Sequence, residues 1–162
     1  MNLRQTTIKD QIDLKKIYFD SIQSIDEKIY SKEQKLAWCS QAWINLEFHR
    51  SITRGKGFIM EDINENIGFA IRYPENKLSL LYVSGNFKRK GVGNILIKTI
   101  EKDAIEEGIS SLDTEASLLS YQLFLKNNWK ILRKEKIIIQ NIIFYRYKMF
   151  KNLKKSNYEI KE

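Results

Sequence analysis

Apolar residues recur with a helical period in the first third of the chain. Between Asp10 and Ser24 they fall along one face of a helix, which follows a short strand expected at residues 2–7. Ser31 and Gln34 have the spacing of a capping box, and this predicts that a second helix begins there. Ser40 is a candidate N-cap for a third helix. The chain is therefore expected to open with helices that precede any substantial sheet.

From residue 58 the pattern changes to short runs of strand-forming residues. These runs are separated by turn residues at 64–66 and 74–76. The alternation predicts a meander of three antiparallel strands. The strands are expected at residues 58–62, 67–73 and 78–83.

The last of these strands leads into a crossover. A helix beginning near Gly91 and ending at Gly108 connects strand 78–83 to a strand expected at residues 110–116. A strand, helix, strand unit of this length predicts that its two strands are parallel.

The final part of the chain predicts one more helix and a hairpin. Ser117 is expected to cap the helix, which stops at Asn127 and Asn128 because asparagine tolerates the left-handed conformation. Two long strands at residues 129–139 and 142–150 then close the domain.

Composition fits one α/β domain with a mixed sheet. The chain has 162 residues, of which 43% are hydrophobic, enough for a core over residues 1–150, with a charged tail at 151–162. A single cysteine, Cys39, excludes an internal disulfide framework. With a single histidine, His49, there is no His/Cys cluster of metal-ligand spacing, so we expect no metal.

The formal net charge of +8 allows an anionic partner but does not choose one. Basic and aromatic residues are not interleaved on any one predicted strand face, so nucleic acid is not the expected partner. The N-terminal stretch lacks the apolar run of a secretory signal, and no apolar run reaches membrane-spanning length. We therefore expect a cytoplasmic chain that does not contact a membrane.

Residues 78–94 combine a strand, a basic glycine-bearing loop and the start of a helix. The first N–H groups of a helix have no intrahelical partners and carry the positive end of its dipole, so they bind anions. Gly91 and Gly93 would let an anionic group approach the backbone, and the charges of residues 88–90 suit several phosphates. This stretch is a candidate phosphate cradle, although a plain solvated turn would have the same composition.

Three sequence blocks resemble the GNAT family of N-acetyltransferases. Lys88-Arg-Lys-Gly91-Val-Gly93 is similar to the family's Gln/Arg-x-x-Gly-x-Gly/Ala acyl-CoA signature, with lysine at the first position. Tyr30-Ser31-Lys-Glu-Gln-Lys-Leu-Ala-Trp38 and Thr114-Glu-Ala-Ser117 resemble a small, uncharacterised bacterial subgroup. The resemblance implies a three-layer GNAT-like α/β fold. Its sheet would be mixed and mostly antiparallel, with a β-α-β crossover that carries the acyl-CoA loop.

The resemblance also implies acetyl-CoA as co-substrate and names the residues that hold it. The pyrophosphate would be bound by the loop residues Lys88, Arg89, Lys90, Gly91, Val92, Gly93 and Asn94. The pantetheine arm would lie along the backbone of Leu81, Tyr82 and Val83, in the manner of an added strand. Ser117 stands where the family has an asparagine that contacts this arm.

The implied reaction is direct attack of a primary amine on the thioester in a ternary complex, without a covalent enzyme intermediate. The family's tyrosine that protonates the leaving thiolate corresponds to Phe124, which would contact the cofactor but cannot donate a proton. Tyr121, Tyr145 or water are the alternatives. Glu115, with Asp113 as a second choice, is the candidate base through a bridging water.

The acceptor is expected to be a small-molecule or peptide amine. Tyr30 and Trp38 are the residues that we expect to line its pocket, although hydrophobic packing explains them as well. Because Phe124 lacks a hydroxyl group, the alternative function is a catalytically impaired GNAT-like module that binds or senses CoA. The final strands are candidates for pairing in a homodimer.

Overall fold

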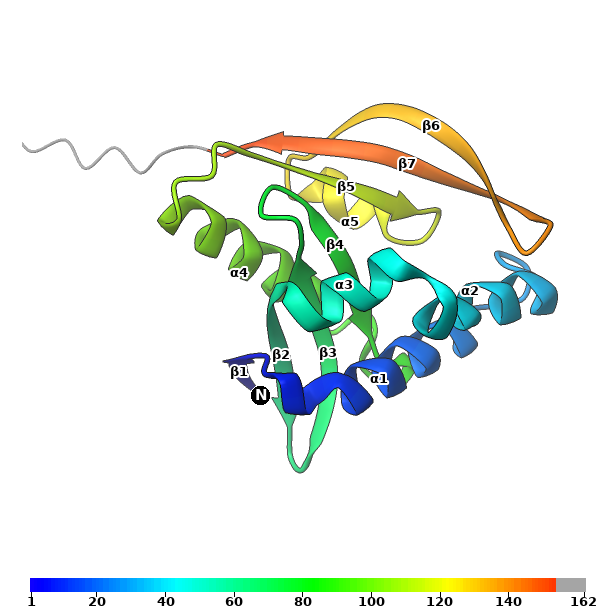
Figure 1. Ribbon diagram of the computed structural model, residues 1–162, viewed down its shortest axis with the longest axis horizontal. Coiled ribbons are helices and arrows are strands. Elements are labelled where there is room, and N and C mark those ends of the chain that lie inside the picture. Colours follow the sequence, from blue (N-terminus) through cyan, green and yellow to red (C-terminus); the bar gives the residue numbers. More distant parts are fainter. Residues whose placement is uncertain (154–162) are drawn as a thin grey trace, which may run out of the picture.

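The N-terminal half of the protein pairs four strands into one antiparallel sheet. The computed structural model describes residues 1–153, and the first sheet has the order β1-β2-β3-β4 (Figure 1). Its central strands are held in register by pairs such as Phe58 with Ala70 and Ala70 with Leu81. The strands are β1 (Asn2–Gln5), β2 (Lys56–Asp62), β3 (Glu65–Arg72) and β4 (Leu78–Val83).

The C-terminal half forms a second antiparallel sheet with the order β5-β7-β6. A tight turn at Gln140 and Asn141 joins β6 to β7, and both residues have positive φ angles, of 48° and 64°. The predicted hairpin is confirmed, and its turn is of the kind that matches the twist of paired strands. The strands are β5 (Ser111–Ser117), β6 (Lys130–Ile139) and β7 (Ile142–Asn152).

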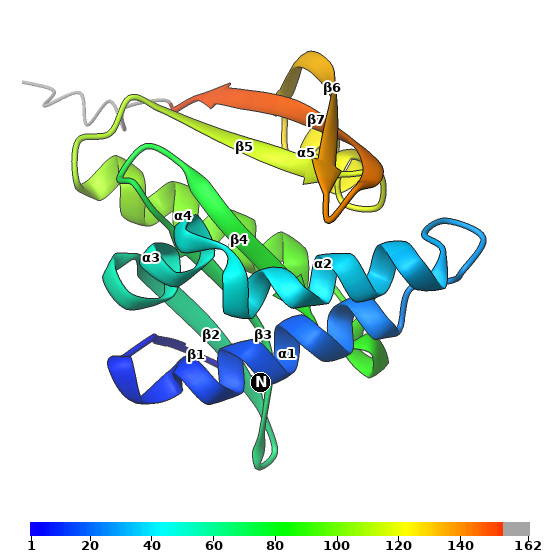
Figure 2. The same cartoon turned by 45° about the vertical axis from the view of Figure 1, so that its right-hand side comes forward.

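The two sheets meet beside Lys77, at the start of β4. Lys77 and Asp113 form an isolated parallel bridge, and the Thr114 hydroxyl donates to the Leu78 carbonyl at 2.7 Å. The crossover from β4 through α4 (Val92–Glu106) to β5 is therefore parallel, as predicted. Beyond this bridge the sheets form separate layers, as Figure 2 shows, so the predicted mixed sheet is split in two.

Helices cover both faces of the first sheet. On one face, α1 (Gln11–Gln23), α2 (Lys32–Ile44) and α3 (Leu46–Arg54) bury an apolar cluster that includes Phe69. On the other face, α4 packs with Leu96 and Ile97 against a second cluster, which also contains residues of α5 (Tyr121–Lys126) and the second sheet. This layered α/β arrangement confirms the fold class expected from the sequence.

Two predicted caps are wrong. Ser40 lies inside α2, where its hydroxyl donates to the Ala37 carbonyl at 2.6 Å, while Asn45 caps α3 by accepting from Phe48 N at 2.9 Å. Ser117 ends β5 instead of capping α5, because three residues separate it from the first residue of that helix. The capping box of Ser31 and the stop at Asn128, with a φ of 65°, are confirmed.

The last strand is longer than predicted. β7 continues to Asn152, and Leu153 N donates to the Ser110 carbonyl at 2.8 Å. The remainder of the charged tail lies outside the described residues. Among residues 1–153, no helix has both the length and the apolar character needed to cross a membrane.

Candidate functional site

A groove of about 740 Å³ lies between β4 and β5 and reaches the N-terminus of α4. Its walls come from the segments that the sequence singled out: the end of β4, the loop before α4, the end of β5 and the start of α5. Apart from Lys90, which it does not include, the groove contains all residues expected to bind the co-substrate. These are Leu81, Tyr82, Val83, Lys88, Arg89, Gly91, Val92, Gly93, Asn94, Ser117 and Phe124.

The edge of β4 that faces β5 is open. β4 pairs with β3 along its length, but in the described part of the chain its other edge makes only the bridge at Lys77 and the bond from Thr114 to the Leu78 carbonyl. Unpaired backbone groups on a strand edge can pair with an extended ligand. The backbone of residues 81–83 is therefore available in the groove to a ligand that lies like a strand.

The start of α4 offers a run of free backbone donors. Within residues 1–153, no hydrogen bond engages the backbone N–H groups of residues 89–94, and the first helical bond runs from Ile95 N to the Gly91 carbonyl at 3.1 Å. Arg89 and Gly91 have positive φ angles of 59° and 83°, which turn the chain into the helix. Free N–H groups at a helix N-terminus can bind an anion, so this segment has the geometry that a phosphate cradle needs.

The two glycines of the loop have different roles. A Cβ atom on Gly91 would meet nothing within 4 Å, so this position requires glycine because of its backbone angle. A Cβ atom on Gly93 would lie 2.9 Å from Leu123 Cδ2. Gly93 thus allows α4 to pack closely against α5, whereas the sequence suggested only that it admits a ligand.

Lys88 does not present its charge to the cradle as the sequence suggested. Its ammonium group donates to the Ser21 carbonyl at 2.6 Å and to the Ser24 hydroxyl at 2.8 Å, at the end of α1. Burial lowers the pKa of Lys88. Lys88 therefore ties the loop to α1, and the exposed cations at the cradle are Arg89 and Lys90.

A second pocket of about 490 Å³ adjoins the groove. It contains Tyr30, Tyr145 and several polar side chains from α2, β4 and β7. Tyr30 is buried, and its ring centroid lies 5.1 Å from that of Trp38, so packing and pocket lining occur together. Four residues line both cavities and mark their junction: Trp38, Tyr82, Glu115 and Ser117.

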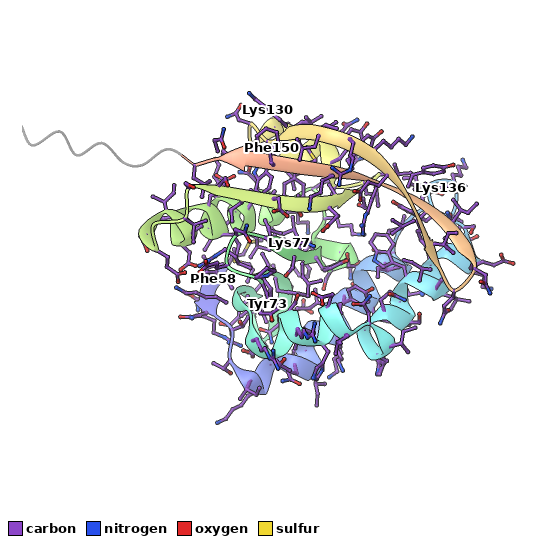
Figure 3. The ribbon with its side chains drawn as sticks, turned by 45° about the horizontal axis from the view of Figure 1, so that its top comes forward. Phe58, Tyr73, Lys77, Lys130, Lys136 and Phe150 are labelled. Atoms are coloured by element: carbon purple, nitrogen blue, oxygen red, sulfur yellow. The ribbon has the colours of Figure 1, made fainter. Side chains whose placement is uncertain are left out.

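Glu115 lies at this junction as an ion-paired carboxylate. It contacts Lys77 Nζ at 2.7 Å and Lys148 Nζ at 3.3 Å, and Lys77 lies where the two sheets meet (Figure 3). Burial raises the pKa of Glu115, but the hydrogen bond and charge of Lys77, with the charges of Lys148 and Arg146, outweigh burial and hold this pKa below its usual range. Glu115 is therefore ionised at neutral pH and is a weaker base than a free carboxylate.

The candidate acids have different positions. Phe124 lines the groove and packs edge-on against Trp129, with ring centroids 4.9 Å apart. The Tyr121 ring instead packs on Tyr147 at 4.5 Å, and Tyr121 lines neither the groove nor the second pocket. Tyr145 is 45% exposed at the second pocket. The structure thus places Tyr121 away from the site where the sequence expected it.

Sequence reasoning did not identify Lys77, Lys148 and Arg146 as site residues. Arg146 and Lys148 lie at alternate positions on β7, opposite Ser117 and Glu115. The sequence does predict that residues 146 and 148 share a face, because side chains two apart on a strand point to the same side. It does not predict that they lie opposite Ser117 and Glu115, because this depends on the register between β5 and β7.

Comparisons with known proteins found one matching family model and many solved structures of similar fold. A family model described as "Acetyltransferase (GNAT) domain" matches residues 27–150. A solved GCN5-related N-acetyltransferase from Rhodopseudomonas palustris is 26% identical, with a TM-score of 0.86 over 94% of this chain and 95% of that chain. The comparison with curated protein sequences found no match.

Two further solved structures contain coenzyme A or acetyl-CoA. PaiA N-acetyltransferase from Thermoplasma acidophilum, in complex with coenzyme A, is 18% identical, with a TM-score of 0.71 over 94% of this chain and 99% of that chain. The structure of yncA from Salmonella typhimurium with acetyl-CoA is 14% identical, with a TM-score of 0.66 over 95% of this chain and 94% of that chain. At these identities the likeness shows the shared fold.

Proposed function

The chain belongs to the GNAT acetyltransferase family, and from this premise we propose that it transfers the acetyl group of acetyl-CoA to a primary amine. The acceptor is a small molecule or a peptide, and it attacks the thioester directly in a ternary complex. One observation carries the proposal. A groove with an open strand edge and a free helix N-terminus meets a second pocket at Trp38, Tyr82, Glu115 and Ser117.

The groove suits the two chemically distinct parts of acetyl-CoA. The free N–H groups of residues 89–94 would bind the pyrophosphate, and the exposed cations of Arg89 and Lys90 add attraction. The open edge of residues 81–83 would pair with the amides of the pantetheine arm. The acetyl group would then reach the junction, and the amine would approach it from the second pocket.

At the junction Glu115 is the group that we assign to proton removal from the amine. Its carboxylate is ionised, and both cavities reach it. Because its pKa is depressed, it is better suited to pass the proton on through water than to retain it. Lys77 and Lys148 hold the carboxylate at the end of β5, where the thioester would lie.

A thiol-release assay tests the proposed function. The purified protein is incubated with acetyl-CoA and each member of a panel of primary amines, and free CoA thiol and acetylated amine are both measured. Thiol release that depends on the amine is expected. Binding of CoA without release for any amine would contradict transfer and favour the CoA-binding module, the alternative that Phe124 and the position of Tyr121 support.

Replacing Glu115 with glutamine is expected to lower kcat about 100-fold, because the amide cannot accept the proton of the amine. Asp113→Asn is the matched control. Asp113 bonds the same Lys148 at 3.1 Å but lines neither cavity, so this variant is expected to keep the wild-type rate. Thermal unfolding of both variants checks that they fold. Unchanged turnover in Glu115→Gln would remove Glu115 from the mechanism.

A further inference from the structure

The hydroxyl group of Tyr30 is buried beside the junction of the groove and the second pocket. Tyr30 precedes α2 and is 2% exposed, and its ring is flanked by Trp38 and by Phe144, whose centroid lies 6.2 Å away. Its oxygen accepts a hydrogen bond from Leu118 N at 3.0 Å. Leu118 follows Ser117, which lines both cavities.

The neighbouring hydroxyl groups leave the Tyr30 proton without an acceptor. Ser117 Oγ accepts from Leu119 N at 3.3 Å and from Ser120 N at 3.1 Å, which uses both of its lone pairs. Its own proton can then donate to Ser120 Oγ, 3.0 Å away. Ser117 cannot accept from Tyr30 without losing a backbone donor. Within residues 1–153 the phenolic proton therefore remains free for a ligand.

The surroundings of Tyr30 favour a proton donor over a base. Burial raises the pKa of Tyr30, so the phenol is protonated at neutral pH. The Leu118 N–H acts in the opposite direction, because it stabilises negative charge on the phenolic oxygen. A phenol that is protonated at rest, with a donor aimed at its oxygen, can release its proton briefly and recover it.

The proposed transfer needs such a donor. A thiolate that leaves an acetyl group must take up a proton, and the two side chains of α5 considered for this step cannot supply it. Phe124 has no proton to give, and Tyr121 packs away from the groove against Tyr147. We propose that Tyr30 is the catalytic acid of this protein and donates its hydroxyl proton to the departing sulfur of CoA. The assignment rests on the proposed acetyl transfer.

The step balances in atoms and charge. The amine nitrogen forms a bond to the acetyl carbon, the bond between that carbon and sulfur breaks, and the Tyr30 proton moves to sulfur. The products are an amide and a thiol, and Tyr30 is left as a phenolate that accepts the Leu118 N–H bond. The proton that Glu115 removes from the amine nitrogen passes through water in the second pocket to this phenolate, so Tyr30 and Glu115 are both regenerated.

Tyr30→Phe removes the hydroxyl group and keeps the ring between Trp38 and Phe144. We expect kcat with acetyl-CoA to fall about 100-fold, while the Kd for CoA, measured by calorimetry, stays at the wild-type value. Tyr147→Phe is the control, because Tyr147 lines neither cavity and its variant should keep the wild-type kcat. Thermal unfolding confirms that both variants fold.

A second measurement separates an acid from a structural hydroxyl group. Fluorotyrosine and difluorotyrosine at position 30 lower the pKa of the phenol stepwise and keep the shape of the side chain. If Tyr30 is the catalytic acid, kcat should change with the phenol pKa along this series. A kcat that does not vary across this series, or an unchanged kcat in Tyr30→Phe, would overturn the proposal even though wild-type protein releases thiol. If neither the wild-type protein nor the fluorotyrosine variants release thiol with any amine, acetyl transfer itself is wrong, and so is the assignment of Tyr30.

Discussion

Replacing Arg72 with methionine lowers the free energy of unfolding by about 3 kcal/mol. The Arg72 side chain on β3 is 2% exposed, and one of its terminal nitrogens lies 2.6 Å from the carboxylates of both Asp103, on α4, and Glu107, which caps the end of α4. Removing the guanidinium leaves two carboxylates short of a partner at the interface between α4 and the first sheet. The expected loss of stability is at the low end of the range for breaking a buried ion pair, because Lys56 still contacts both carboxylates at 2.6 Å.

Urea unfolding of both proteins measures this change. Arg50→Met is the matched control, because Arg50 pairs with Glu47 at 2.9 Å on the surface and its loss should cost less than about 1 kcal/mol. Lys56 and Arg72 hold the pKa of Glu107 below its usual range. The stabilisation that Glu107 contributes through these two partners is therefore present above the ordinary pKa of a glutamate, about 4.3, and is lost as the pH falls through the lower pKa of the folded state. The penalty should shrink in acid, and a penalty equal to that of the control would refute the role of Arg72.

Reversing the two exposed charges of the cradle, in the double variant Arg89→Glu and Lys90→Glu, raises the Kd for acetyl-CoA about 100-fold. Two attractions to the phosphates become two repulsions, a change of about 3 kcal/mol for charges near a protein surface. Because these residues are exposed, added salt should reduce the difference in Kd between the double variant and the wild-type protein. Isothermal titration calorimetry at low and physiological ionic strength measures both effects.

The control for this variant makes the same change in net charge on α4, away from the loop at residues 88–94. Lys98 and Lys102 are exposed and line neither cavity, so Lys98→Glu with Lys102→Glu should leave the Kd within a few-fold of wild type. Equal weakening by both double variants would show that only the overall charge matters. In that case the loop at residues 88–94 would not be the phosphate cradle.

The local sequence pattern correctly predicted the strand and the helix that line the groove, β4 and α4. The bounds of β4, Leu78–Val83, agree with its predicted range, and α4 begins one residue after Gly91. These features depend on strand propensity, on the helical period of apolar residues and on the position of glycine, and each of these is determined by a few neighbouring residues. The Gly91 loop could therefore be predicted as a candidate anion site before its surroundings were known.

Long-range contacts decided what the sequence did not predict. Lys88 bonds Ser21, which is 67 residues earlier in the chain, and the Tyr30 oxygen accepts from Leu118, which is 88 residues later. No local period encodes such pairs. Tyr121 occupies a helical position that sequence spacing alone assigned to the site, but the pairing of β5 with β7 places the Tyr147 ring against it. The separation of the two sheets likewise depends on pairing between distant strands.

Thermal unfolding with and without acetyl-CoA tests the central claim most directly, which is that the groove between β4 and β5 binds this co-substrate. A ligand that binds only the folded state stabilises it by about 2.7 kcal/mol at a concentration one hundred times its Kd. For a domain of this size the expected rise in Tm is roughly 5–10 °C. At the same concentration the Arg89→Glu and Lys90→Glu double variant should show a much smaller rise. A Tm that does not change as acetyl-CoA is raised to millimolar concentration would contradict the assignment of the groove.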